Sequence, residues 1–213
     1  GDPFASRRIS VGTSHVNILA LTLFRNAGNP RPGQKLPVAY MPYSKVKKWM
    51  PERVAKMRSQ FPNDIIVASL HWGRQYSEKP SRGQVSLARA LVDAGADIVL
   101  GHHPHVLQPV EVYRKGLILY SLGNLVFDQI RADARKSAVF HIQMKRGTGE
   151  RMFPVGLTMV PIQLRKVSKG PRRASASEAK SNLLRIQAQS KKRFKTRLEL
   201  SENQLVWKLN ASF

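Results

Sequence analysis

Four of the chain's six histidines lie in two short clusters that could bind a metal ion or exchange protons. His71 forms the first cluster, and the second contains His102, His103 and His105. Two imidazoles separated by Pro104 can converge on one ion, and His71 can supply a third. Neutral imidazole suits Zn²⁺, Mn²⁺ or Fe, and such an ion lowers the pKa of bound water and polarises a phosphoryl or carbonyl oxygen. The alternatives are a histidine network that stabilises a loop and a general acid–base histidine without metal.

A strand–helix–strand unit is expected to position these clusters. Residues 64–70 and 97–100 are short, β-branched apolar runs typical of buried parallel strands. Residues 83–94 have a helical apolar face, and Gly95 stands where a left-handed residue ends a helix. Both strands of a right-handed unit run the same way, so the two clusters emerge at one sheet edge. That carboxyl edge is where open α/β sheets bind ligands.

Further strands and helices are predicted around this unit. Residues 9–22 predict a hairpin whose second strand is central in a sheet, and residues 110–120 predict another. Residues 44–61 predict a helix, or a short turn followed by a helix that begins at Pro51. The remaining expectations are a loop over 26–42, a strand over 137–145, a hairpin turn at 147–149, one or two strands over 151–164 broken at Pro154 and Pro161, a basic linker over 166–176, a helix from Ser177 to about Leu200, and an edge strand over 205–209.

Charge is distributed unevenly along the chain. The 213 residues include 36 Lys and Arg against 13 Asp and Glu, a formal net charge of +23. Residues 61–130 carry 6 basic and 6 acidic side chains, whereas residues 1–60 carry 11 and 2, and residues 131–213 carry 19 and 5. Such basic flanks favour a polyanion: nucleic acid, an anionic membrane or wall, or an acidic polymer. The alternative is a solvated basic surface.

Several chemistries lack the motifs they need. The sequence has no cysteine, so disulfides and thiolate metal ligands are excluded. It has no Gly-x-Ser-x-Gly nucleophile motif, no Walker-type phosphate loop and no dinucleotide-binding fingerprint after a strand. It also contains no apolar run of membrane-spanning length, and its first residues do not resemble a signal peptide. The histidines therefore remain the main candidates for chemistry, with or without a metal ion.

Three segments carry a resemblance to a known family: residues 64–73, residues 93–106, and residues 120–124 with the sequence Tyr-Ser-Leu-Gly-Asn. They resemble the bacterial capsule-synthesis CapA family, which is associated with poly-γ-glutamate and is similar to the calcineurin-like metallophosphoesterases. The resemblance implies an α/β, layered metallophosphoesterase-like fold. Residues 1–165 would form the C-terminal portion of that domain, and residues 166–213 would add a basic linker, an amphipathic helix and an edge strand packed on it.

The resemblance also implies roles for individual residues. His71 and His103 would be catalytic, and together with His105 they would bind a divalent transition metal (Mn, Zn or Fe). The further pocket residues would be His102, Asn124 and Trp72, with His102 replacing His103 if the register shifts by one. The family's Gly-Asp, Asn-Leu-Glu and Asn-Asn-His motifs are absent, and Arg74-Gln75 stand where the family has Glu. Three imidazoles bind one ion at best, so a metallophosphoesterase-like hydrolase would need ligands from a missing N-terminal half.

The function implied is that of a CapA-like cell-envelope protein in the synthesis, anchoring or export of an anionic polymer such as poly-γ-glutamate. It would act on the extracytoplasmic face through an N-terminal anchor that is not present in this chain. Its expected partners are the polymer, other capsule-synthesis membrane proteins and the N-terminal half of the same protein. The alternatives are a metal-dependent phosphoesterase on small or lipid-linked phosphates and a basic module that binds nucleic acid non-specifically.

Overall fold

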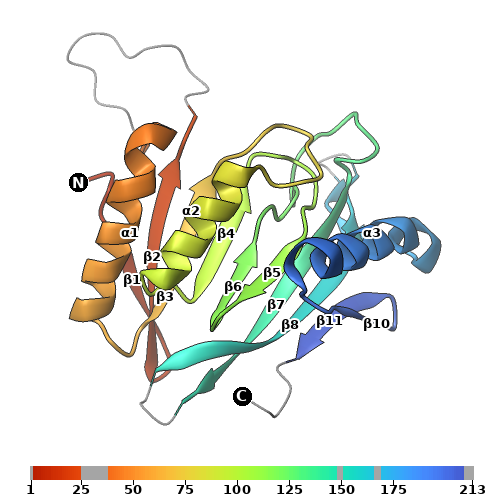
Figure 1. Cartoon of the computed structure of the whole chain (residues 1–213). Helices are drawn as coiled ribbons and strands as arrows, with labels where there is room; N and C mark the ends of the chain where they lie inside the picture. Colours follow the sequence, from red (N-terminus) through yellow and green to blue (C-terminus); the bar gives the residue numbers. More distant parts are fainter. Residues whose placement is uncertain (1, 25–37, 148–150, 166–168, 209–213) are drawn as a thin grey trace, which may run out of the picture.

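The computed structural model describes residues 2–24, 38–147, 151–165 and 169–208, which form two β-sheets and three helices (Figure 1). One sheet has six strands in the order β1-β2-β3-β4-β6-β5, and the other has five, in the order β10-β11-β8-β7 with β9 paired to β8. The elements are β1 (Arg7–Val11), β2 (Ser14–Thr22), α1 (Tyr43–Gln60), β3 (Ile65–His71), α2 (Arg82–Asp93), β4 (Ile98–His102), β5 (Val110–Tyr113), β6 (Gly116–Leu119), β7 (Lys136–Arg146), β8 (Met152–Gln163), β9 (Arg172–Arg173), α3 (Ala176–Phe194), β10 (Glu199–Ser201) and β11 (Gln204–Lys208).

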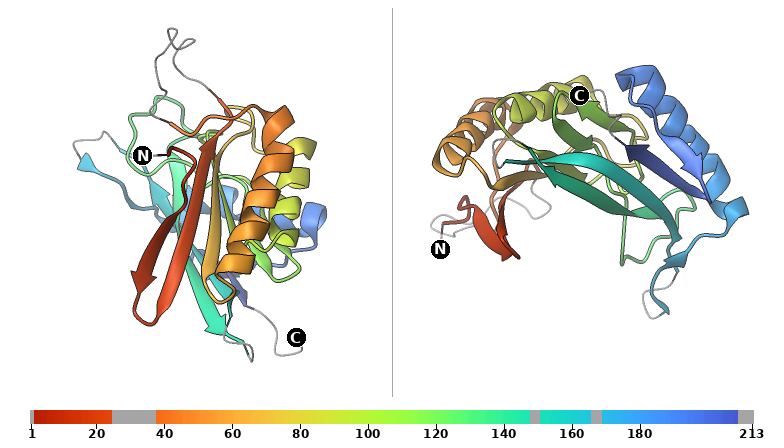
Figure 2. Two further views of the ribbon diagram at one scale, coloured as in Figure 1. Left: turned by 90° about the vertical axis from the view of Figure 1, so that its left-hand side faces the viewer. Right: turned by 90° about the horizontal axis from the view of Figure 1, so that it is seen from below.

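The six-stranded sheet has a parallel centre. Strands β2, β3, β4 and β6 run in the same direction, and the hairpin partners β1 and β5 are antiparallel at the two edges. The predicted strand–helix–strand unit is therefore confirmed as β3-α2-β4, and the strand after the first hairpin turn is central, as expected. Helices α1 and α2 both lie on one face of this sheet (Figure 2). The mixed α/β class expected from the sequence is confirmed.

Helix α2 begins and ends as the sequence indicates. The Ser81 side chain accepts a hydrogen bond from the Gln84 backbone, and the Gln84 side chain accepts one from the Ser81 backbone. This reciprocal pair satisfies two amides that a helix start leaves without partners. At the other end Gly95 takes φ +113°, a conformation that side chains beyond glycine rarely adopt.

Of the two alternatives predicted for residues 44–61, the uninterrupted helix is confirmed, and the short turn followed by a helix from Pro51 is wrong. The helix is continuous from Tyr43 to Gln60 with Pro51 inside it. Proline removes one backbone hydrogen bond and strains the preceding turn. Here the apolar stripe lies on both sides of the proline and is fully or almost fully buried against the sheet, so packing outweighs that loss. The stripe consists of Val46, Met50, Val54 and Met57.

The expected break at Pro154 and Pro161 is also wrong, because β8 runs without interruption through both. The register of β8 against β7 shifts between Gln143 and Met144, opposite Pro154. The backbone N–H that Pro154 lacks is therefore missing at a point where the strand pairing is already irregular. On the other side of β8, Pro161 lies between the stretch paired with β11, which ends at Met159, and the stretch paired with β9. Proline is therefore tolerated at both positions.

Helix α3 is shorter than predicted. It ends at Phe194, because Lys195 takes a left-handed conformation (φ 60°, ψ 10°), and β10 then forms where the helix was expected to continue. The predicted linker contains the short strand β9, and residues 166–168 of it lie outside the described residues. The same is true of most of the predicted loop over 26–42 and of the hairpin turn at 147–149, which are described only over 38–42 and at Gly147.

Apolar side chains of α3 pack against both sheets in one buried cluster. Leu183 and Ile186 of α3 pack with Leu117 of β6 and with Leu157 and other side chains of β8. The described part of residues 166–213 thus shares a core with the histidine-bearing sheet. No helix among the residues placed in the structure is long and apolar enough to span a membrane.

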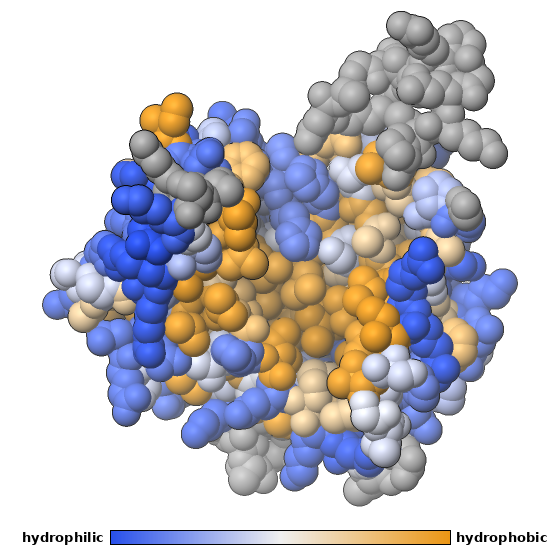
Figure 3. Space-filling model, turned by 180° about the vertical axis from the view of Figure 1, so that it is seen from behind, coloured by the Kyte–Doolittle hydropathy of each residue, from blue (hydrophilic) through white to orange (hydrophobic). Residues whose placement is uncertain are grey.

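The face of the six-stranded sheet opposite α1 and α2 is apolar and partly open. Alternate residues of β3 point to this side, where Ile65 and Val67 pack with Ile98 of β4. The side chains around them are only partly buried: Val16, Ile18, Leu100, Ile142, Met144 and Met152. Viewed from behind, hydrophobic surface gathers in a hollow on this face, bordered by hydrophilic side chains (Figure 3).

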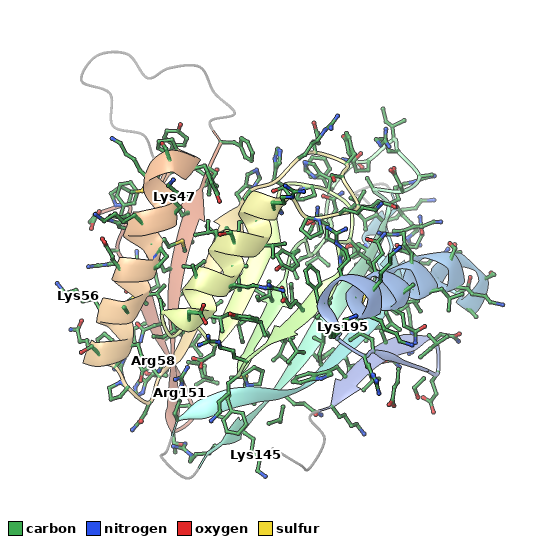
Figure 4. All side chains as sticks on the ribbon, in the orientation of Figure 1. Lys47, Lys56, Arg58, Lys145, Arg151 and Lys195 are labelled. Atoms are coloured by element: carbon green, nitrogen blue, oxygen red, sulfur yellow. The ribbon has the colours of Figure 1, made fainter. Side chains whose placement is uncertain are left out.

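A buried carboxylate holds the amino ends of the central strands together. Asp97, whose side chain is fully buried, accepts hydrogen bonds from the Arg58 guanidinium (Nη2–Oδ2, 2.6 Å) and from the Arg151 guanidinium (Nη2–Oδ1, 2.8 Å). It also accepts one from the backbone N–H of Ile66 (2.8 Å). Arg58 donates further bonds to the carbonyl oxygens of Gly95, Phe61, Pro62 and Asp64. Both arginines reach this point from distant elements (Figure 4).

We expect Asp97→Asn to destabilise the fold by about 3–5 kcal/mol, because it leaves two partly buried guanidinium groups without their counter-charge. The matched control is Asp93→Asn, which removes a carboxylate from an exposed ion pair with Arg114 and should cost less than about 1 kcal/mol. Urea unfolding followed by circular dichroism measures both. Equal costs at the two positions would show that the buried network does not stabilise the fold.

Candidate histidine site

The two predicted histidine clusters meet at the carboxyl edge of the six-stranded sheet. His71 is the last residue of β3 and His102 the last of β4, and they are direct partners in the parallel register. His103 and His105 follow in the loop after β4. The backbone N–H of Trp72 donates to the carbonyl of His102 (3.0 Å) and extends the pairing by one residue.

Three of the histidines form a contiguous group. His71 Nε2 and His103 Nδ1 are 3.0 Å apart, a hydrogen bond in which one ring donates and the other accepts. The ring centre of His105 lies 6.1 Å from that of His103. His105 Nδ1 is 2.8 Å from Asn124 Oδ1, and since an amide oxygen only accepts, this nitrogen carries the proton and Nε2 keeps a free lone pair. His102 instead contacts the Ser69 hydroxyl (3.2 Å).

The loop that carries these rings is held in an unusual backbone conformation. His103 has φ +94° and His105 has φ +60°, values that cost a residue with a Cβ atom about 1–3 kcal/mol each. Backbone strain of this kind occurs where the surroundings impose it, often at functional sites. Gly101 is required for a different reason: a Cβ atom there would lie 1.9 Å from the carbonyl oxygen of Tyr120. Close packing against Tyr120, the residue that follows β6, explains this glycine.

Aromatic side chains surround the histidines, and the sequence reasoning did not find them. Phe24 stacks on His103 with ring centres 4.5 Å apart, and Phe127 lies 5.3 Å from His105. Tyr76 lies 6.0 Å from His105. Phe127 is three residues from Asn124 in the sequence, so its place beside the histidines could have been predicted. Phe24 precedes the predicted loop, and no local pattern in the sequence connects it with the histidines. These rings lower the local polarity and limit access of water to the histidines.

The environment favours neutral imidazoles. Burial lowers the pKa of His71 and of His103 below the usual 6.5, and repulsion between neighbouring histidines lowers both further. Burial alone lowers the pKa of His102. Neutral imidazole is the form that binds a transition metal. However, no group of three or more His, Asp or Glu side chains among the described residues is arranged to hold an ion. The donor chemistry therefore fits a metal, while the number of converging ligands falls short.

Of the predicted pocket residues Asn124 and Trp72, only Asn124 lies beside the histidines. Asn124 is buried beside the histidines, and its amide nitrogen donates to the carbonyls of His105 and Ala134. It therefore orients the loop as well as the His105 ring. Trp72 does not line the site: its side chain is fully buried in the core beneath α1 and α2, and its indole N–H donates to the carbonyl of Tyr120 (3.0 Å).

Because His103 is held at positive φ, we expect His103→Gly to be more stable than His103→Ala by about 1–2 kcal/mol. His102 is the control, since it lies in β4 with ordinary strand backbone, and there glycine should be less stable than alanine by about 0.5–1 kcal/mol. Thermal unfolding of the four variants measures the two differences. The same sign at both positions would contradict the strained loop.

We expect the imidazoles of His71, His102 and His103 to titrate below pH 6.5 in chelator-treated protein, as followed by NMR of the ring protons. The unfolded chain then binds protons at a higher pH than the folded chain, so stability is greatest above pH 6.5 and falls as the pH is lowered through the folded-state pKa values. His102→Gln should make this fall shallower. Ring protons that titrate above pH 6.5 would contradict the environment described.

Both the sequence and the structure resemble known proteins. Residues 5–129, which include all the histidines of the site, match the family described as bacterial capsule synthesis protein PGA_cap. The chain is 46% identical over 108 residues to the capsule biosynthesis protein CapA of Bacillus anthracis, covering 51% of this chain and 25% of that protein. It is 46% identical over 109 residues to the PGA biosynthesis protein CapA of Bacillus subtilis, covering 51% and 27%.

A solved structure of a hypothetical protein from Thermus thermophilus aligns with 75% of this chain and 62% of its own, at 13% identity and a TM-score of 0.45. That likeness is too weak to assign the fold. The chain spans about a quarter of the length of the two curated relatives. The segment that matches the family, by contrast, covers more than half of the chain and includes all the histidines of the site. The chain therefore belongs to the bacterial capsule synthesis protein family, PGA_cap, that includes the CapA proteins.

Proposed function

We propose that this chain is part of a CapA-like cell-envelope protein that acts in the synthesis, anchoring or export of an anionic polymer such as poly-γ-glutamate. The family match and the names of the two relatives, which refer to capsule and PGA biosynthesis, support this role. One observation carries the proposal furthest: the paired histidines His71 and His103 lie at the ligand-binding edge of the sheet, inside the matched segment. The extracytoplasmic location, an N-terminal anchor and contacts with other capsule-synthesis membrane proteins belong to the same proposal.

We further propose that the histidines bind one divalent transition metal ion, Mn, Zn or Fe. His71 Nε2 and His103 Nδ1 lie 3.0 Å apart and would face one ion once it displaces the proton that they share, and His105 has a free Nε2 because Asn124 engages its other nitrogen. When bound, such an ion lowers the pKa of bound water and polarises a phosphoryl oxygen. Among the described residues, no group of three or more histidine and carboxylate side chains is placed to hold an ion. In this proposal the missing ligands come from the N-terminal half of the same protein.

The same half would complete the fold. We propose a layered metallophosphoesterase-like (calcineurin-like) architecture in which further chain covers the open apolar face of the six-stranded sheet. The hollow in Figure 3 supports this, because apolar side chains in contact with water lose the stabilisation that burial gives, about 25 cal/mol per Å². His71 and Ser69 point to the same side as Ile65 and Val67, so a covering segment would also reach the histidine edge.

A second candidate function, a metallophosphoesterase-like hydrolase acting on lipid-linked phosphates, is favoured by the surface beside His105. Leu125, Val126 and Phe127 are 57%, 59% and 47% exposed. An apolar rim next to the proposed metal site suits a substrate that has both a phosphate and an apolar part. In such a reaction His71 and His103 would hold the ion, and the proton that their ring nitrogens share without metal would be released when it binds.

We expect the purified chain to take up transition metal, and His71→Ala and His103→Ala each to abolish the uptake, as measured by mass spectrometry of metal content after dialysis. The control is His141→Ala, which removes an exposed histidine of β7 and should leave metal content unchanged. Equal metal content in all four proteins would contradict the site. Metal-stimulated hydrolysis of phosphate esters that is lost in the first two variants would favour the hydrolase over a purely polymer-binding role.

A further inference from the structure

A basic cleft with an apolar floor lies far from the histidines along the sheet. It has a volume of about 630 Å³, within the range of ligand-binding pockets. The turn between β5 and β6, the start of β8, the residues after α3 and the strand β11 surround it. Most of its lining comes from residues beyond the segment that matches the family. The cleft is therefore not explained by the histidine site.

Cations from separate parts of the chain form its rim. Lys115 lies in the β5–β6 turn, Lys195 and Arg197 follow α3, and Lys208 ends β11. All four side chains are exposed, and within the described part of the chain none has a carboxylate within ion-pair distance. Glu199 is the single acidic residue in the lining. Unpaired cations gathered around a concave apolar wall focus positive potential on the space between them.

The floor of the cleft is hydrophobic. Val112, Phe153 and Trp207 line it and are each half-buried, so apolar surface remains available at the bottom. The left-handed backbone at Lys195 ends α3 abruptly and turns the chain along the rim. No local pattern in the sequence indicates this arrangement, because its cations and its aromatic rings come from segments far apart in the chain.

We propose that this cleft binds an extended stretch of γ-linked glutamate polymer, an inference that rests on the proposed function and adds a second site to it. Each γ-linked unit carries one free carboxylate and places two methylene groups in the polymer backbone. The carboxylates accept charge-assisted hydrogen bonds from the Lys and Arg side chains of the rim. The methylenes pack on the apolar floor. A single nucleic-acid strand would need open aromatic faces for base stacking, whereas Phe153 and Trp207 are half-buried.

The cleft and the histidines lie at opposite ends of the sheet. Gly116 lines the cleft and begins β6, whereas His102 ends β4, and these two strands are parallel. The cleft is thus at the amino edge and the histidine site at the carboxyl edge. A bound polymer can occupy the cleft without blocking the histidines, so the chain would hold the polymer at one end of the sheet and leave the other end open for chemistry.

The test is titration of the chain with short poly-γ-glutamate at about 0.1 M salt, where exposed ion pairs still contribute. We expect the double variant Lys115→Gln/Arg197→Gln to bind about tenfold more weakly than wild type. The matched control, Lys47→Gln/Lys56→Gln, removes two exposed cations from α1 on another part of the surface and should change affinity less than about twofold (Figure 4). Polymer should also change tryptophan fluorescence in wild type but not in Trp207→Phe.

The outcomes separate the cleft from the proposed function. Equal weakening in the two double variants would overturn the cleft while leaving polymer binding intact. A single-stranded oligonucleotide of equal charge that binds as tightly, with the same dependence on Lys115 and Arg197, would overturn the proposed occupant. No binding of polymer by the wild-type chain would overturn the polymer function and the cleft together. Thermal unfolding of each variant confirms that the losses do not arise from misfolding.

Discussion

The buried carboxylate of Asp97 fixes how the central strands meet. Its side chain accepts the backbone N–H of Ile66, and its own backbone N–H donates to the carbonyl of Ile66, so the starts of β3 and β4 are joined twice. Arg58 and Arg151 neutralise the charge and tie α1 and β8 to the same point. The register of β3 against β4 is the same along the whole pair. The contacts of Asp97 at the start of these strands therefore also determine that His71 is opposite His102 at their other end.

The histidine edge contrasts with the rest of the molecule in its electrostatics. The chain carries a formal charge of +23, yet the segment that holds the site has equal numbers of acidic and basic residues. Burial and mutual repulsion keep His71 and His103 from adding to the positive charge at neutral pH. Cations are instead concentrated on surfaces away from this edge, including the rim of the amino-edge cleft. The exposed cations and the histidine edge therefore occupy different regions of one small fold.

Periodicity predicted the elements well where local pattern and tertiary structure agree. The β3-α2-β4 unit, both hairpins and the gathering of histidines at one edge were accessible because apolar spacing reports directly on burial. The errors occurred where packing overruled a local signal. Pro51 and Pro154 did not break their elements because buried side chains and a shifted register accommodate them, and Lys195 ended α3 against a favourable pattern. Side-chain direction, as for Trp72, and clefts built from distant segments are not encoded in any one stretch of sequence.

The parallel centre of the sheet has a consequence for the order in which the chain folds. The hairpins β1–β2 and β5–β6 join neighbouring segments through short turns and form on the microsecond scale. The parallel pairs, such as Val16 with Ile65, join segments separated by a helix and must wait for a larger loop to close. Until these pairs form, the unpaired edges of the separate hairpins stay open to other chains. The His71–His103 contact depends on the slower parallel pairs, so we expect it to form after the hairpins.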